Sequence, residues 1–223
     1  MRAELLKLAG LPSVWVAVAL SLLLPPVVVL LNARAASSPD TGFLELTAGV
    51  LGPLVLGTVA AGSEYRGGQI ATSLVCVPSR MRLLAAKTGA LVLSVAVTAA
   101  VGAVVTPAVA GVLTGGTGPR IAGVVVYWVL DALLAYGITL LTRSGVLPLT
   151  VLIVNSTVVS VSFLLTRLTP LAAYLPDLAG AQMFIEPHDV GTDLTPVTAG
   201  LVMGAWVAVL LGVAAYVFHR RDA

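Results

Sequence analysis

The chain has 223 residues, of which 58% are hydrophobic and only 10% are charged, and its mean hydropathy is +1.05. A soluble domain carries about 25% charged residues, so these values exclude an ordinary soluble domain and place the chain in a lipid bilayer. The net charge of +2 is too small to indicate nucleic-acid binding, and the single cysteine excludes an intramolecular disulfide and a multi-cysteine metal site.

Six apolar stretches are long enough to be membrane-spanning helices. They lie at residues 13–31, 43–61, 83–105, 121–141, 146–165 and 196–218. Residues 1–12 mix leucines with charged residues, which suits either a short interfacial helix on the cytoplasmic side or a frayed basic terminus. The apolar pieces 171–175 and 178–184 are too short to cross a bilayer and suit small helices at its outer face. The predicted fold is an all-α polytopic membrane protein with one domain, residues 1–223.

The basic residues are distributed unequally between the predicted loops. With the N-terminus in the cytoplasm, the inner segments hold Arg2, Lys7, Arg66, Arg80, Arg82, Lys87, Arg143, Arg220 and Arg221, and the outer ones hold Arg34, Arg120 and Arg167. Cytoplasmic loops are enriched in Lys and Arg, so we predict that both termini are cytoplasmic. Arg outnumbers Lys by ten to two, and Ala, Val and Gly are abundant, which favours a GC-rich bacterial genome and a bacterial cell membrane.

A polar, basic stretch, residues 64–87, separates the second and third predicted spans. Within it, residues 69–77 are predicted to form a helix with one apolar face, and Pro78 is its expected stop. An amphipathic helix fixed between two spans can lie in the membrane interface and offer its polar side to a cytoplasmic partner. An interfacial loop with no partner is the alternative.

The same stretch resembles the cytoplasmic motif of ABC-2-type transporter permeases. The resemblance is carried by Glu64-Tyr65-Arg66-Gly67-Gly68, then Pro78-Ser79-Arg80, then Lys87, while Gln69 departs from the usual Thr or Ser. It implies six spans and a coupling helix that docks on a separate ATP-binding cassette subunit. The partner-coupling residues that it implies are Glu64, Tyr65, Arg66, Gly68, Pro78, Arg80 and Lys87. Of these, Arg80 and Lys87 would anchor the helix to the partner or to lipid phosphate.

The chain lacks a phosphate-binding loop of its own. Gly111–Gly116 is followed by Thr117 instead of the Lys-Ser/Thr pair that such a loop needs. We therefore expect no enzymatic activity and no cofactor on this chain, with ATP and Mg²⁺ bound by the partner subunit. The outer acidic residues Glu186, Asp189 and Asp193 surround His188, but their spacing fits no zinc pattern, so a solvated loop and no metal site is expected.

Asp131 lies about ten residues into the fourth predicted span, near the middle of the bilayer. A carboxylate at that depth is costly, so it should face the bundle interior or a water-filled cavity, or be protonated. Two interpretations stay open: Asp131 contacts substrate in a translocation path, or it is structural, either in a hydrogen bond with Tyr136 or Asn155 or at a position nearer the membrane surface. The same two interpretations apply to Asn155 and Ser156, which either line the path or hold helices together.

Small residues mark two of the predicted spans. Gly49, Gly52 and Gly57 in the second span permit close helix packing. In the last span, Gly200, Gly204, Ala208 and Gly212 recur every four residues. This face packs either within the chain or against a second copy of it, which leaves a homodimer open.

The leading hypothesis is the membrane subunit of an ATP-driven exporter, in which two copies pair and each docks one ATP-binding subunit. The alternative is an ATP-independent membrane scaffold or immunity-type protein that binds a ligand. An intramembrane enzyme built on Asp131 would need a second catalytic group at similar depth, and the sequence offers none. Apart from membrane lipid and these subunits no partner is expected, and nothing in the sequence indicates the substrate.

Overall fold

The computed structural model describes residues 2–32, 40–63, 80–158, 161–185 and 194–220. All regular structure within these ranges is helical, which confirms the predicted all-α class. Five helical segments among them are long and apolar enough to span a membrane. They are α2 (Pro12–Asn32), η1 with α3 (Leu44–Val50 and Leu51–Gly62), α5 (Arg80–Val109), α6 (Gly118–Thr142) and α10 (Pro196–Arg220).

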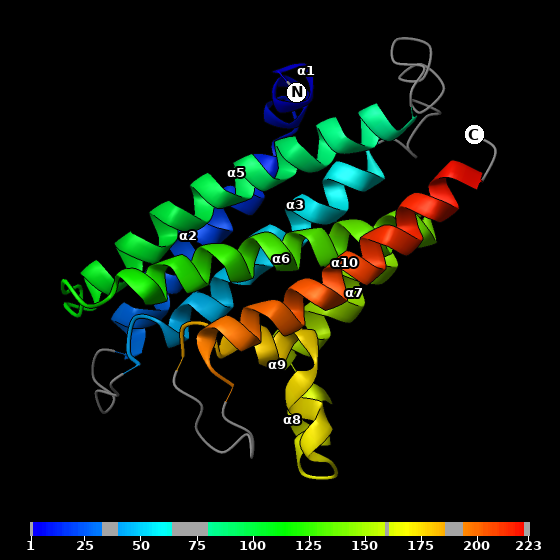
Figure 1. Cartoon of the computed structure of the whole chain (residues 1–223). Helices are drawn as coiled ribbons and strands as arrows, with labels where there is room; N and C mark the ends of the chain where they lie inside the picture. The colour runs from blue at the N-terminus through cyan, green and yellow to red at the C-terminus, as the bar shows by residue number, and fades with distance from the viewer. Residues whose placement is uncertain (1, 33–39, 64–79, 159–160, 186–193, 221–223) are drawn as a thin grey trace.

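Helix α6 is the central element of the bundle. It packs against α3, α5 and α10, while α2 packs against α3 and α5 on the other side (Figure 1). Its large side chains Trp128 and Tyr136 are fully buried. The indole Nε1 of Trp128 donates a 3.3 Å hydrogen bond to the carbonyl oxygen of Leu46 and so joins α6 to η1. Displacements of α6 must therefore be felt by most of the bundle.

Glycines allow the helices around α6 to approach one another closely, as the sequence predicts. A Cβ atom on Gly57 would overlap the backbone carbonyl oxygen of Ala132, and one on Gly52 would overlap the side chain of Ser21. A Cβ atom on Gly49 would overlap the indole ring of Trp128. Without side chains at these positions, α3 can pack backbone to backbone on α6.

The long helices alternate in direction, so their ends gather at two ends of the bundle (Figure 1). One end, which we call the Lys87 end, holds α1 (Arg2–Ala9), the end of α3, the start of α5 and the turn after α6. The other, the Arg120 end, holds the start of α6 and the segment around Phe184. The predicted inner and outer sides are thus separated at opposite ends of the bundle.

The predicted fifth span, residues 146–165, consists of separate helical pieces. They are α7 (Val146–Ile153), a π-helical segment η2 (Val154–Val158) and, beyond residues 159 and 160, α8 (Val161–Thr166). The two short outer helices that the sequence predicts are present as η3 (Pro170–Tyr174) and α9 (Pro176–Ala181). The chain returns from the Lys87 end through these pieces, and the number of six spans stays a prediction.

Candidate functional site

The predicted coupling motif lies mostly outside the described residues. This applies to Glu64, Tyr65, Arg66, Gly68 and Pro78. The described chain shows where the motif is attached, because α3 ends at Gly62 and α5 begins at Arg80. Both attachment points are at the Lys87 end of the bundle (Figure 1).

Lys87, the last residue of the motif, is buried in α5. Its Nζ atom lies 3.0 Å from Oε2 of Glu4, and this ion pair attaches α1 to the first turns of α5. The sequence predicts a contact of Lys87 with the partner or lipid phosphate, which stays untested, and the pair with Glu4 was not anticipated. Residues so far apart in sequence carry no spacing signal that could have revealed it.

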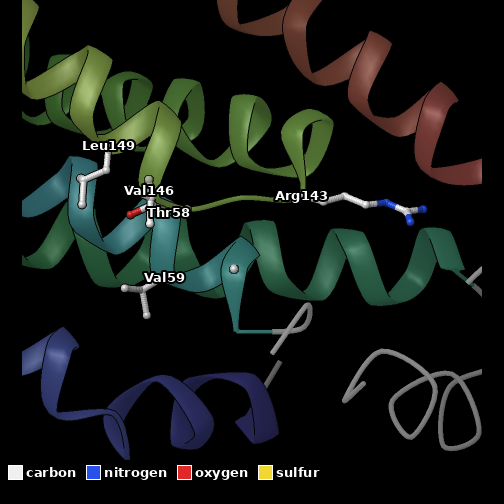
Figure 2. A pocket seen from close by; sticks show the side chains of 7 residues that line it. Thr58, Val59, Arg143, Val146 and Leu149 are labelled. Carbon is white, nitrogen blue, oxygen red and sulfur yellow. The ribbon is translucent and has the colours of Figure 1, made fainter. Parts of the chain in front are cut away.

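A small hollow of about 290 Å³ lies at the Lys87 end, between α3 and the turn after α6 (Figure 2). Its lining consists of Thr58, Val59, Gly62, Arg143, Gly145, Val146 and Leu149. Arg143 has a left-handed backbone (φ 53°), which lets the chain reverse within a few residues. Figure 2 shows its side chain extending away from Thr58 and Leu149. The short connection predicted between the fourth and fifth spans is therefore present.

A larger cavity, of about 690 Å³, lies between α6, the α7–η2–α8 segment and α9. We call it the central cavity. It contains both translocation-path candidates, Asp131 and Asn155, together with Asp177 from α9. The rest of the lining is Leu134, Thr150, Val151, Leu152, Val154, Ser156, Val161, Ser162, Leu165, Leu175 and Pro176. Two carboxyl groups and one amide thus converge on a mainly apolar space.

Asp131 is held at the middle of α6. It follows the helix start at Gly118 by about 20 Å, at 1.5 Å per residue. The side chain is only 6% exposed, and it accepts a hydrogen bond from the hydroxyl of Tyr127, one turn earlier. Tyr127, and not the expected Tyr136, is thus its tyrosine neighbour. The i, i+4 spacing of Tyr127 and Asp131 is a signal that could have identified it.

Asn155 joins two elements across the central cavity. Its Nδ2 atom donates a 2.8 Å hydrogen bond to Oδ2 of Asp177, and its Oδ1 atom accepts one of 3.2 Å from the backbone N–H of Val161. The first bond fixes the start of α9, and the second satisfies a free N–H in the first turn of α8. Asn155 lies in the π-helical segment, and such segments are frequent at functional sites. Both roles proposed for Asn155, lining the path and joining helices, are compatible with this geometry.

Asp177 is the cavity residue that sequence reasoning missed. In the sequence it lies in the polar segment between the fifth and sixth predicted spans, where nothing in its neighbourhood distinguishes it from a solvated acid. The structure brings it to Asn155 through the fold of η3 and α9, whose contacts with α8 and α10 set its position. Only tertiary packing could have revealed this.

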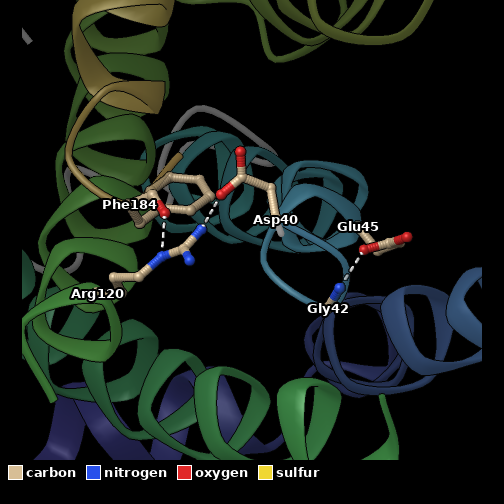
Figure 3. A network of polar contacts seen from close by, with 5 residues as sticks. All are labelled: Asp40, Gly42, Glu45, Arg120 and Phe184. Atoms are coloured by element: carbon tan, nitrogen blue, oxygen red, sulfur yellow. Dashed lines mark hydrogen bonds and ion pairs between the residues drawn. The ribbon is translucent and has the colours of Figure 1, made fainter. Parts of the chain in front are cut away.

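One arginine with three partners closes the Arg120 end, and Figure 3 shows two of these partners, Asp40 and Phe184. Arg120 forms an ion pair with the buried Asp40, and its Nε atom donates a 2.8 Å hydrogen bond to the carbonyl oxygen of Phe184. Its guanidinium group also lies 4.1 Å from the ring centre of Phe43, a cation–π contact. Nearby, the N–H of Gly42 donates to Glu45 at 2.6 Å. Three segments are thus tied together at this end.

The small-residue face of α10 is largely uncovered in the single chain. Gly200 contacts Met183, but a Cβ atom on Gly204 or Gly212 would meet no described atom within 4 Å. Helix α10 packs on α6 through other residues, among them Leu210 and Leu211, which lie against Gly137. Among the described residues, then, no atom packs against the face around Gly204 and Gly212.

These features define a polytopic α-helical membrane protein with an interior cavity that is mainly apolar and holds two carboxyl groups. Residues 1–170 match the family model described as ABC-2 family transporter protein. The match covers more than half of the chain, so the chain belongs to this family and is a permease of the ABC-2 type. The matched region includes Asp131 and Asn155, whereas Asp177 and α10 lie beyond it. No significant match was found among curated proteins or solved structures.

Proposed function

We propose that the chain is the membrane-spanning subunit of an ATP-driven exporter in a bacterial cell membrane. The observation that carries the proposal is the family match over residues 1–170, which falls on a helical bundle with an interior cavity. Permeases of this family generally work with an ATP-binding cassette subunit. ATP and Mg²⁺ would bind to that subunit, and this chain would have no enzymatic activity.

The partner would dock at the Lys87 end, which we propose is cytoplasmic. The segment that contains the predicted coupling helix is attached there, between Gly62 and Arg80. The exposed Arg82 and the turn at Arg143 add positive charge to the same end. This placement agrees with the excess of Lys and Arg in cytoplasmic segments. A six-span topology with both termini in the cytoplasm is part of the proposal.

Force would travel from the coupling segment to the central cavity through α5 and α6. Helix α5 starts next to the segment and packs along α6, which carries Asp131 at its middle. Closure of the ATP-binding subunits would favour one of two bundle conformations, because docking contacts differ between the two. The cavity between α6 and the interrupted α7–η2–α8 segment would then change its access.

Two copies of the chain would pair within the transporter. Support for this comes from the α10 face around Gly204 and Gly212, where no described atom of the same chain would meet an added Cβ. Small residues on such a face allow two helices to approach closely in a membrane.

The test is co-purification of the tagged chain with its ATP-binding subunit, followed by ATP-dependent transport in vesicles. Arg66→Glu and Arg80→Glu are expected to reduce both partner recovery and transport. Arg167→Glu is the matched control, because Arg167 is exposed and follows α8, away from the coupling segment. Equal partner recovery and transport in all variants would exclude the coupling assignment. Ligand binding without any ATP-binding partner would favour the scaffold alternative.

A further inference from the structure

The central cavity combines negative charge with an apolar lining. Asp131 and Asp177 are its two charged residues, and no basic side chain is among its lining residues. Asp131 contacts the Tyr127 hydroxyl, and Asp177 contacts the Asn155 amide. Neither carboxyl group forms an ion pair with a described residue. As far as the described residues show, the cavity therefore has two acidic groups and no counter-charge.

The position of Asp131 makes this lack of a counter-charge significant. It lies at the middle of the central helix and is 6% exposed, so little water is available to solvate it. Ionisable groups at this depth in a membrane protein are expensive and are typical of substrate or ion pathways. A positively charged ligand in the cavity would supply the missing counter-charge to both carboxyl groups.

The rest of the lining decides the kind of cation. A divalent metal ion prefers six or more oxygen ligands, and within the described residues no group of three or more metal-binding side chains is present. Valine and leucine side chains instead supply seven of its fourteen lining residues. Among them Val151, Val154 and Leu165 are also exposed on the bundle surface, so the cavity opens between helices towards the apolar phase. This lining suits an apolar body better than a hydrated ion.

We propose that the central cavity binds an amphipathic organic cation, such as an amine or an onium ion with an apolar body. Asp131 and Asp177 contact its positive charge, and the valine and leucine side chains contact its body. Asn155 is a positioning residue, because its hydrogen bond holds Asp177 in place. That this cation is the exported substrate rests on the proposed function; that it binds does not.

The experiment compares two probes of the same shape and opposite charge, tetraphenylphosphonium and tetraphenylborate. Equilibrium binding to the full chain in nanodiscs is measured against empty nanodiscs, which corrects for partition into lipid. Tetraphenylphosphonium is expected to bind at least about tenfold more tightly than tetraphenylborate, because only the cation is attracted by the two carboxylates. Equal affinities for the two probes would overturn the proposal, and this comparison needs no variant to fold.

Variants then locate the site. Asp131→Asn and Asp177→Asn remove a charge but keep an oxygen that accepts the bond from Tyr127 or Asn155. Each is expected to weaken tetraphenylphosphonium binding by about tenfold. Glu45→Gln is the control, since Glu45 is a buried acid outside the cavity lining that accepts a bond from Gly42, and it should change binding less than about twofold. Unchanged binding in both Asp variants, with normal elution in size-exclusion chromatography, would place the cation elsewhere and overturn the proposal.

A transport assay separates the hypothesis of a cation-binding site from the hypothesis of an ATP-driven exporter. If the cation binds as expected but no ATP-dependent efflux of tetraphenylphosphonium occurs with the partner subunit, the binding site stands and the export of this cation fails. If the chain stimulates its partner's ATP hydrolysis but does not distinguish the two probes, the exporter stands and the cation site is wrong.

Discussion

Lys87 of α5 and Glu4 of α1 form an ion pair of 3.0 Å in which both side chains are largely buried. The pair connects the N-terminal helix to the helix that directly follows the predicted coupling segment. Any push on the start of α5 would therefore also move α1. The N-terminal helix α1 is therefore fixed to the first turns of α5, the third predicted span.

Breaking this pair should destabilise the chain. Because removing either side chain takes the 3.0 Å ion-pair contact from a largely buried charge, Glu4→Gln and Lys87→Gln should each lower the thermal stability of the purified protein. A double-mutant cycle is expected to give a coupling energy of about 1–3 kcal/mol. The measurement is thermal unfolding in detergent of both single variants and the double variant. Strict additivity would show that the two side chains do not interact in the folded protein.

Gly57 and Gly204 should respond in opposite ways to the same substitution. Gly57→Ala places a Cβ atom against the carbonyl oxygen of Ala132 and forces α3 away from α6, at a cost of about 1–3 kcal/mol. Gly204→Ala has open space and should leave monomer stability unchanged or slightly raised. Thermal unfolding of the two variants checks this. Equal losses would mean that the packing of α3 on α6 is looser than described.

A large residue on the α10 face around Gly204 and Gly212 should weaken the contact between two copies of the chain without unfolding either copy. Gly212→Leu fills the space at the uncovered face, so it should reduce the dimer fraction while the monomer remains folded. The dimer fraction can be measured by light scattering in detergent, with Leu201→Ala as a control on an exposed position of the same helix. An unchanged dimer fraction would assign the interface to another helix.

Asn155 offers a graded test of the π-helical junction. Asn155→Ala loses both of its hydrogen bonds and should cost about 1–2 kcal/mol. Asn155→Asp keeps an acceptor for Val161 but sets a carboxylate against Asp177, so without bound cation it should be less stable than the alanine variant. The melting temperature should therefore be highest with Asn155, lower in Asn155→Ala and lowest in Asn155→Asp. The reverse order for Ala and Asp would contradict the contact with Asp177.

Sidedness can be tested with the single cysteine. Cys76 lies in the coupling segment, outside the described residues, and an impermeant thiol reagent added to intact cells should not label it. A matched variant, Cys76→Ala with Arg167→Cys, places the thiol beyond α8 and should be labelled. Labelling of Cys76 on intact cells would invert the proposed topology and remove the docking site.

The helices could be predicted because long apolar runs and the short polar connections between them are visible in the local sequence. The short helix before the first span, the close packing at Gly57 and the tight turn at Arg143 all follow from local residue types. The π-helical segment at Val154–Val158 could not be predicted, since the backbone N–H of Val161 donates a hydrogen bond to the Asn155 side chain from further along the chain. An apolar run alone does not indicate where its helix will change from α to π geometry.

The candidate site was predicted in part. Asp131 and Asn155 were singled out because polar groups in apolar spans are costly, and the structure places both at one cavity. Asp177 and the Glu4–Lys87 pair depend on how distant segments fold together, which no local pattern reports. The coupling roles of all seven motif residues remain predictions, and all of these residues except Arg80 and Lys87 lie outside the described part of the chain.

The contacts of Arg120 have a consequence for the direction of motion. One guanidinium group holds Asp40, the Phe43 ring and the Phe184 carbonyl, so these segments cannot separate without losing all three contacts together. The Arg120 end would therefore stay fixed during a conformational change, and the helices would move most at the Lys87 end. A molecule that leaves the central cavity would then pass beside the Arg120 contacts, next to α8, and not through the middle of the Arg120 end.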